Sequence, residues 1–303
     1  MPQRSNLGYR DMPKREHCSG RGISSGRLPD FIGVGPPRTG TTWLHEVLKT
    51  QVGVPAGIKE THFFTLHYDK GLAWYQAHFY NCPVNRPIGE FCPSYFDSPE
   101  ARGLIARHIP RCKIICTLRE PAGRLYSQYR MLRYPAKFPN HLDELRKFPG
   151  LLEGSRYVAR LSAWLETFGP KNVLVLLYDD LVDNPQRLLD DVCSFIGIEP
   201  VALDSSPVGT KVVNLFPACK APGLLPLGRL SDSMLYWLRS HRMYRVLKLW
   251  QESPLWNFCF GGGQAYGPLA PETEARLRRF FLPDVEELEK LLKRDLRRWK
   301  PLL

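Results

Sequence analysis

Residues Gly35 to Trp43 read GPPRTGTTW, a turn rich in Gly and Pro that leads into two threonines and a tryptophan. The preceding run DFIGVG, from Asp30 to Gly35, predicts a short apolar strand, and the following run TTWLHEVLKT, from Thr41 to Thr50, carries apolar side chains at helical spacing. The backbone N–H groups of such a turn and of a helix N-terminus can bind a phosphate group. The sequence therefore predicts a phosphate-binding loop between a strand and a helix.

The order of strand, turn and helix occurs twice more along the chain. KIICTL (Lys113–Leu118) predicts a buried strand before a helix that begins at Pro121 and runs through Arg133, and NVLVLLYDDL (172–181) predicts a strand before a helix from Pro185 to Phe195. Further helices are expected at Ala101–Ile109 and Tyr157–Phe168. Three such units predict an α/β fold of the P-loop type, in which helices flank a mostly parallel sheet.

We expect one domain from residue 30 to residue 303, preceded by a basic, disordered tail at residues 1–29. Residues 201–270 are rich in Pro and Gly around one helical stretch at 231–250, and they predict a lobe or lid of helix and loop. The C-terminal residues predict two amphipathic helices separated at Pro283. The side chains expected to face inward there are Leu277, Phe280, Phe281, Val285, Leu288, Leu291 and Leu292.

Composition restricts the class of protein. The 303 residues are 43% hydrophobic, enough for one large core, and no uncharged apolar run reaches the roughly 20 residues that cross a bilayer. The N-terminus lacks the apolar segment of a secretory signal, and the eight cysteines form no CxxC pair, so we expect a cytoplasmic protein with reduced thiols. The net charge of +12 indicates a polyanionic partner, but no nucleic-acid-binding motif accompanies it.

Arg38 lies inside the predicted loop and is followed by Thr39, Gly40, Thr41 and Thr42. An NTPase loop carries its phosphate-binding lysine directly after the last glycine, where this chain has Thr41, and this difference argues against an ATPase. A cation inside the loop followed by GTT resembles the sulfotransferase family, which usually has lysine at the position of Arg38. The resemblance implies that Arg38 to Thr42 bind the 5′-phosphosulfate of 3′-phosphoadenosine 5′-phosphosulfate (PAPS), with Arg38 also taking part in catalysis.

The second unit, TLREPAGRLYSQY (Thr117–Tyr129), places Arg119 at the end of a strand and Ser127 on the next helix. In the sulfotransferase family, which this segment resembles, such a pair binds the 3′-phosphate that distinguishes PAPS from ATP. GSRY (Gly154–Tyr157) is similar to the family as well, and the resemblance implies that Tyr157 belongs to the nucleotide site.

The segment IKETHFF (Ile58–Phe64) lies between the two phosphate-binding units. It resembles the branch of the family that acts on heparan, and the resemblance implies that Glu60 is the general base that takes the proton of the acceptor. His62 is the alternative base. A histidine in an aromatic segment is more often a packed or supporting group, so we favour Glu60.

GEFCPSYFDS (Gly89–Ser98) resembles the heparan N-sulfotransferases, with Glu90 and Tyr95 on matching positions. Two positions differ, because Phe91 stands where those enzymes have a lysine and Met131 stands where they have an acceptor-side histidine. The walls of the acceptor site are expected from Arg86, Phe91, Met131 and the acceptor-side lobe at 201–270. These residues follow no recognisable pattern, so the sequence names no acceptor.

The motifs and the resemblance together predict an enzyme that moves a sulfuryl group from PAPS to a hydroxyl or amine, with carbohydrates among the candidate acceptors and no metal required. A Mg²⁺-dependent nucleotide kinase or NTPase is one alternative, with Asp179 at the end of VLVLLYDD as its metal ligand. An inactive glycan-binding relative would bind the nucleotide without turnover. A basic nucleic-acid binder would show steep salt dependence. The sequence predicts no oligomeric state.

Overall fold

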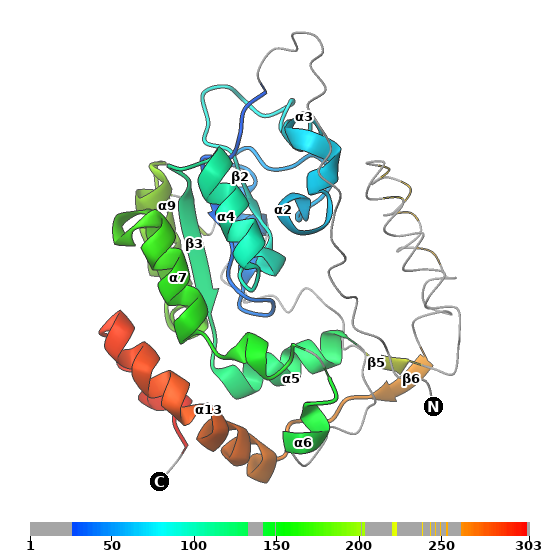
Figure 1. The fold of residues 1–303 in the computed structure, drawn as a ribbon, viewed down its shortest axis with the longest axis vertical. Coiled ribbons are helices and arrows are strands. Elements are labelled where there is room, and N and C mark those ends of the chain that lie inside the picture. Colours follow the sequence, from blue (N-terminus) through cyan, green and yellow to red (C-terminus); the bar gives the residue numbers. More distant parts are fainter. Residues whose placement is uncertain are drawn as a thin grey trace.

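The computed structural model describes residues 26–132, 142–148, 150–200, 202–203, 220–222 and 262–301, with residues 238, 243, 246, 249 and 253. At its centre lies a four-stranded parallel sheet in the order β2-β1-β3-β4. Figure 1 labels β2 and β3 of this sheet. The strands are β1 (Phe31–Gly33), β2 (Gly89–Phe91), β3 (Lys113–Leu118) and β4 (Val173–Leu177). The predicted α/β fold with a parallel sheet is confirmed.

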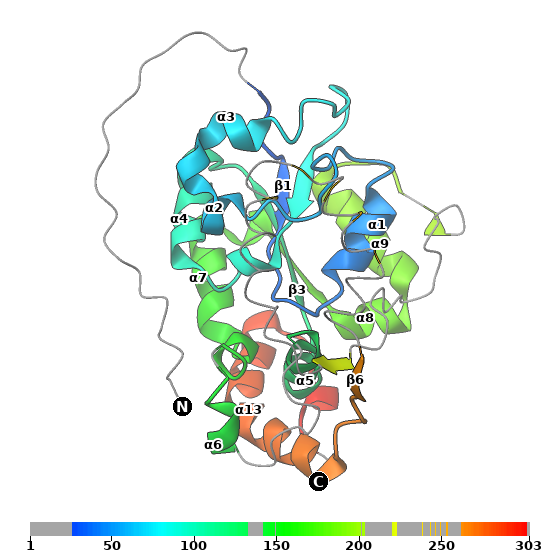
Figure 2. The ribbon, with the colours of Figure 1, turned by 90° about the vertical axis from the view of Figure 1, so that its right-hand side faces the viewer.

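Helices cover both faces of this sheet (Figure 2). Helices α1 (Thr41–Leu48) and α9 (Pro185–Ile196) pack on one face, and α4 (Pro99–His108) and α7 (Val158–Phe168) pack on the other. Because side chains alternate along a strand, Ile115 of β3 joins the first layer while Ile114 and Cys116 join the second. Burial on both faces explains why β3 reads as a continuous apolar run.

The remaining elements are α2 (Phe63–Leu66), η1 (Tyr68–Lys70), α3 (Gly71–Gln76), η2 (Pro93–Tyr95), α5 (Pro121–Met131), α6 (Leu142–Leu145), η3 (Glu153–Ser155), η4 (Pro170–Asn172), α8 (Tyr178–Asp183), α13 (Pro271–Leu292), η6 (Arg297–Trp299) and the antiparallel pair β5 (Lys220–Pro222) and β6 (Gly262–Ala265). The strand expected at 172–181 ends at Leu177, because α8 begins at Tyr178. Strand β2 was not predicted, since its three residues are too few to show a periodicity.

Helix α13 corrects the prediction of two helices separated at Pro283. It is a single helix with Pro283 inside it. A proline removes only one backbone N–H, and burial of the residues on one side of the helix offsets that loss. The side chains buried there are Leu277, Phe281, Val285 and Leu288, whereas Leu291 is 38% exposed.

Only part of the predicted tail and lobe belongs to the described residues. Residues 26–29 of the tail do, and they pack against the domain: Arg27 donates hydrogen bonds to the carbonyls of Pro83 (2.9 Å) and Arg86 (2.8 Å), and Leu28 contacts the core. The rest of the tail and most of the lobe at 201–270 lie outside the described residues. Of the helix expected at 231–250, only residues 238, 243, 246 and 249 are described, and 238, 246 and 249 are helical.

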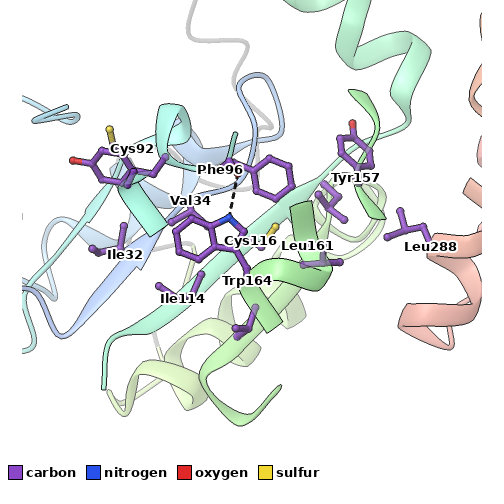
Figure 3. Close-up of a cluster of buried hydrophobic side chains, with 14 of the residues drawn as sticks. Ile32, Val34, Cys92, Phe96, Ile114, Cys116, Tyr157, Leu161, Trp164 and Leu288 are labelled. Atoms are coloured by element: carbon purple, nitrogen blue, oxygen red, sulfur yellow. Dashed lines mark hydrogen bonds between the residues drawn. The ribbon is translucent and has the colours of Figure 1, made fainter. Parts of the chain in front are cut away.

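The layer between the sheet and α7 is centred on Trp164 (Figure 3). Its ring is fully buried beside Cys116, and its Nε1 donates a hydrogen bond to the Phe96 carbonyl at 3.1 Å. This bond ties the helix to the segment that follows β2.

We expect Trp164→Phe to lower the free energy of unfolding by about 2–3 kcal/mol, because the Phe96 carbonyl loses its donor and a small cavity opens. Urea unfolding followed by circular dichroism measures the change. Tyr80→Phe is the control, since Tyr80 is 56% exposed and should change stability by less than about 0.5 kcal/mol. Equal midpoints for the Trp164 variant and the unmodified protein would contradict this account.

Candidate active site

The loop after β1 is held against β3 by a close backbone approach. A Cβ atom at Gly35 would lie 2.4 Å from the backbone N of Thr117, so only glycine fits there. The Thr39 hydroxyl donates to the Pro36 carbonyl (2.7 Å) and lies 2.6 Å from the Thr117 hydroxyl. Gly40 takes a φ of 99° directly before α1. Thr39, predicted to bind phosphate, therefore uses its hydroxyl to anchor the loop.

Arg38 and Ser127, predicted for different phosphates, are direct partners. Arg38 Nε donates to Ser127 Oγ at 2.9 Å, across 89 residues of sequence. Arg119 Nη1 donates to the Arg38 carbonyl at 3.4 Å, and its guanidinium group lies over the ring of Tyr178, with 4.4 Å from Cζ to the centroid. Three predicted site residues thus meet beyond the carboxyl ends of β1 and β3, where open α/β sheets bind ligands.

Tyr157 belongs to the same region, but its ring is fully buried. Its hydroxyl donates to the Arg119 carbonyl at 2.8 Å, and burial raises the pKa of Tyr157, so the phenol stays a donor. The Asp284 carboxylate of α13 accepts the Tyr157 N–H at 2.7 Å. Tyr157 therefore fixes the backbone of Arg119, and any effect on a nucleotide acts through that arginine.

Sequence reasoning missed Arg124, which is fully buried beneath the loop. Its guanidinium group donates to Ser155 Oγ (2.9 and 2.8 Å), Gln128 Oε1 (2.6 Å) and the carbonyls of Pro37 and Leu151 (3.4 and 3.3 Å). In the sequence, one arginine on an amphipathic helix is indistinguishable from a solvated one. Its burial makes it the connection between the loop, α5 and η3.

Lys59 is the second residue that sequence reasoning missed. Its Nζ donates to Thr41 Oγ1 (3.1 Å), Thr42 Oγ1 (3.2 Å) and Glu60 Oε1 (3.0 Å). Burial and the nearby Lys59 charge lower the pKa of His45, on the same helix as Thr41, to about 4, so His45 is neutral at pH 7. The only signal in the sequence was the position of Lys59 next to the predicted base. The ammonium group thus connects the predicted base to the phosphate loop.

His62 contacts Glu60 from the other side. Its Nε2 lies 3.4 Å from Glu60 Oε2, while its Nδ1 lies 3.0 Å from Ser94 Oγ and 3.6 Å from Cys92 Sγ. Among the described residues, Glu60, His62 and Cys92 form the group whose ligand atoms are close enough to share a metal ion, all within 4.8 Å of one another. That the reaction needs no metal stays a prediction.

Glu90 supports this segment from below. Its buried carboxylate accepts hydrogen bonds from the Thr61 N–H (3.2 Å) and hydroxyl (2.8 Å), from Tyr75 (2.7 Å) and from Tyr95 (3.0 Å). Burial raises the pKa of Glu90, and these donors act against the rise. Because Thr61 lies between Glu60 and His62, Glu90 fixes the backbone that carries both.

Two of the residues that were expected to line the acceptor site lie elsewhere. Strand alternation turns Phe91 to the face opposite Glu90, where it is 1% exposed and packs against Phe31 at 5.9 Å between centroids. Arg86 lies before β2, at the amino edge of the sheet, and donates to the Thr50 carbonyl. Met131, at the end of α5, remains partly exposed.

Asp179, the metal ligand of the kinase alternative, is engaged elsewhere. Its carboxylate accepts a hydrogen bond from Trp299 Nε1 at 2.5 Å, and the adjacent Asp180 makes a bidentate pair with Arg294 (2.7 and 2.8 Å). These contacts attach the C-terminal segment to α8. Asp179 thus holds the C-terminus in place and does not belong to the described group of close ligand atoms.

A family model described as a sulfotransferase domain matches residues 28–206, more than half of the chain, and the chain therefore belongs to the sulfotransferase family. The solved structure of a sulfotransferase from Alicyclobacillus acidocaldarius has the same fold, with a TM-score of 0.63 at 21% identity, covering 90% of this chain and 99% of that one. The enzyme class predicted from the sequence is confirmed.

Curated relatives include the human bifunctional heparan sulfate N-deacetylase/N-sulfotransferase 3, which is 31% identical over 201 residues. This match covers 57% of the present chain but only 23% of that protein. Human heparan sulfate glucosamine 3-O-sulfotransferase 3B1 is 29% identical over 213 residues, covering 67% of this chain and 55% of that one. The chain thus matches 23% to 55% of the length of these relatives.

No helix among the described residues is both long and apolar enough to span a bilayer. The cytoplasmic location stays a prediction.

We expect Asp179→Ala to lower the melting temperature, because Trp299 Nε1 loses an ionised acceptor worth about 1.5–3 kcal/mol. Sulfuryl transfer at a temperature where the variant is folded should fall by less than about threefold, since the carboxylate serves stability. EDTA should leave the rate of both proteins unchanged. If the unmodified protein strictly requires Mg²⁺ and the Asp179 variant loses this Mg²⁺-dependent activity, the kinase alternative is restored.

Proposed function

We propose that this sulfotransferase takes its sulfuryl group from PAPS and transfers it to a hydroxyl or amine of a carbohydrate. The observation that carries the donor assignment is the 2.9 Å contact between Arg38 and Ser127, with Arg119 against the Arg38 carbonyl. These side chains form a cationic group at the end of the loop. Such a group suits a ligand that carries phosphate at both ends of its ribose.

In the proposed reaction, the acceptor oxygen or nitrogen forms a bond to sulfur as the bond between sulfur and the bridging phosphate oxygen breaks. Glu60 takes the proton of the acceptor, and adenosine 3′,5′-bisphosphate leaves. Arg38 and the hydroxyls of Thr41 and Thr42 stabilise the charge that grows on the leaving phosphate, where one such donor is typically worth about 3 kcal/mol. The residues act mainly by positioning and by electrostatic stabilisation.

The carbohydrate acceptor rests on the relatives, whose names identify heparan sulfate as what they act on. The net charge of +12 agrees with a polyanionic glycan. Since Phe91 is buried and Arg86 lies at the far edge of the sheet, the acceptor must be read by residues other than these two.

If Arg119, Ser127 and Arg38 hold a 3′-phosphate and a 5′-phosphate together, adenosine 3′,5′-bisphosphate should raise the melting temperature far more than AMP or ADP at equal concentration. Differential scanning fluorimetry measures the shifts. Arg119→Gln should remove most of the advantage of the bisphosphate while leaving the small AMP shift. Equal shifts for all three nucleotides would refute the donor assignment.

If Glu60 is the base, Glu60→Gln should lower turnover of an alcohol acceptor by about 10²-fold or more, because the amide keeps the shape but cannot take a proton. His62→Ala should cost less. Transfer of ³⁵S from labelled PAPS to a panel of oligosaccharides gives the rates. A nearly fully active Glu60→Gln enzyme beside an inactive His62→Ala enzyme would assign the base to His62, and no transfer to any oligosaccharide would refute the carbohydrate acceptor.

A further inference from the structure

Lys59 forms hydrogen bonds with two parts of the site that have different roles in the proposed reaction. An ammonium group has three N–H donors, and Lys59 has three acceptors within 3.2 Å: the hydroxyls of Thr41 and Thr42 and the carboxylate of Glu60. The Lys59 side chain is 18% exposed and that of Glu60 is 30% exposed, so water shields this pair only in part. All three N–H groups of Lys59 therefore have a hydrogen-bond acceptor.

Lys59 also supplies what the loop lacks in its sequence. The position after Gly40, where NTPase loops carry a phosphate-binding lysine, is Thr41, and the Lys59 ammonium group lies 3.1 Å from the Thr41 hydroxyl. A lysine from a segment 18 residues further along the chain thus reaches the start of α1.

We infer that Lys59 holds Glu60 while the donor site is empty and moves to the donor when it binds, which releases the base. This inference rests on the proposed function. The 5′-phosphosulfate of the donor carries two negative charges, one on the phosphate and one on the sulfate, and the 5′-phosphate of adenosine 3′,5′-bisphosphate carries up to two. Both exceed the single charge of Glu60, and charge-assisted bonds to them are stronger than those to neutral hydroxyls. Lys59 therefore turns toward the phosphate, and Glu60, which keeps its contact with His62, loses its lysine partner only after the donor has bound.

The inference makes a thermodynamic prediction that needs neither acceptor nor turnover. Binding of adenosine 3′,5′-bisphosphate must break the contact between Lys59 and Glu60. Removing the carboxylate should therefore strengthen binding, and the gain should depend on Lys59. A double-mutant cycle isolates this dependence from the general effect of removing a negative charge near an anion.

Isothermal titration calorimetry with adenosine 3′,5′-bisphosphate tests the cycle. We expect Glu60→Gln to tighten binding by about fivefold or more in the presence of Lys59, and Lys59→Gln to weaken it by about tenfold. In the Lys59→Gln background, Glu60→Gln should change the affinity by less than about twofold. Lys59→Arg should retain most of the coupling, because it keeps the charge, and circular dichroism verifies that each variant is folded.

The pair formed by Lys49 and Glu46 is the matched control, since it is also a contact between lysine and glutamate and lies at the other end of α1 from the loop. Variants Lys49→Gln and Glu46→Gln should show no coupling to the nucleotide. Equal effects of Glu60→Gln with and without Lys59 would overturn the inference while leaving the donor assignment intact. A wild-type protein that prefers AMP or ADP over the bisphosphate would instead overturn the proposed function.

Discussion

The site depends on one buried guanidinium group. Arg124 is fully enclosed, and burial lowers its pKa, because removing a charge from water is costly unless each of its N–H groups finds an acceptor. Its hydrogen-bond acceptors are neutral: a hydroxyl, an amide oxygen and two backbone carbonyls, one of them that of Pro37 in the loop after β1. A shift of the loop would leave a buried N–H without a partner. The loop therefore keeps its shape relative to α5, the helix that carries Ser127.

A buried carboxylate has the same function at the other end of the site. Glu90 is enclosed as completely as Arg124, and four donors surround it, two of them from Thr61. Thr61 is thereby fixed between Glu60 and His62. The two ends of the site thus rest on separate buried groups, and Lys59 connects them through its hydrogen bonds to Thr41, Thr42 and Glu60. In the inferred exchange, the ammonium group changes partners by rotation of its own side chain, without any movement of the backbone.

The sequence predicted the parts of this arrangement that are local. A strand, a Gly/Pro turn and a helix lie side by side in the chain, so β1, the loop and α1 could be located, and β3 matched to the residue. The contact between Arg38 and Ser127 spans 89 residues and was not predicted, because the family resemblance assigned the two side chains to different phosphates. Lys59 and Arg124 were missed because side-chain charge in a sequence does not reveal burial or partners. The continuity of α13 through Pro283 could not be predicted, because it depends on packing against the rest of the domain, whereas sequence rules consider only the neighbouring residues.

Phe91 and Glu90 are neighbours on β2, but their side chains face opposite sides of the sheet. Glu90 faces Thr61 and the segment that carries Glu60, whereas Phe91 faces α1. A lysine at the position of Phe91 would be buried at high cost without an ionised partner. A phenylalanine there packs against Phe31 and within 6.4 Å of the neutral ring of His45. Strand β2 consequently supports the segment that carries Glu60 and completes the core, but offers no cation to an acceptor. In the proposed function, recognition of an anionic glycan must come from cations outside this strand.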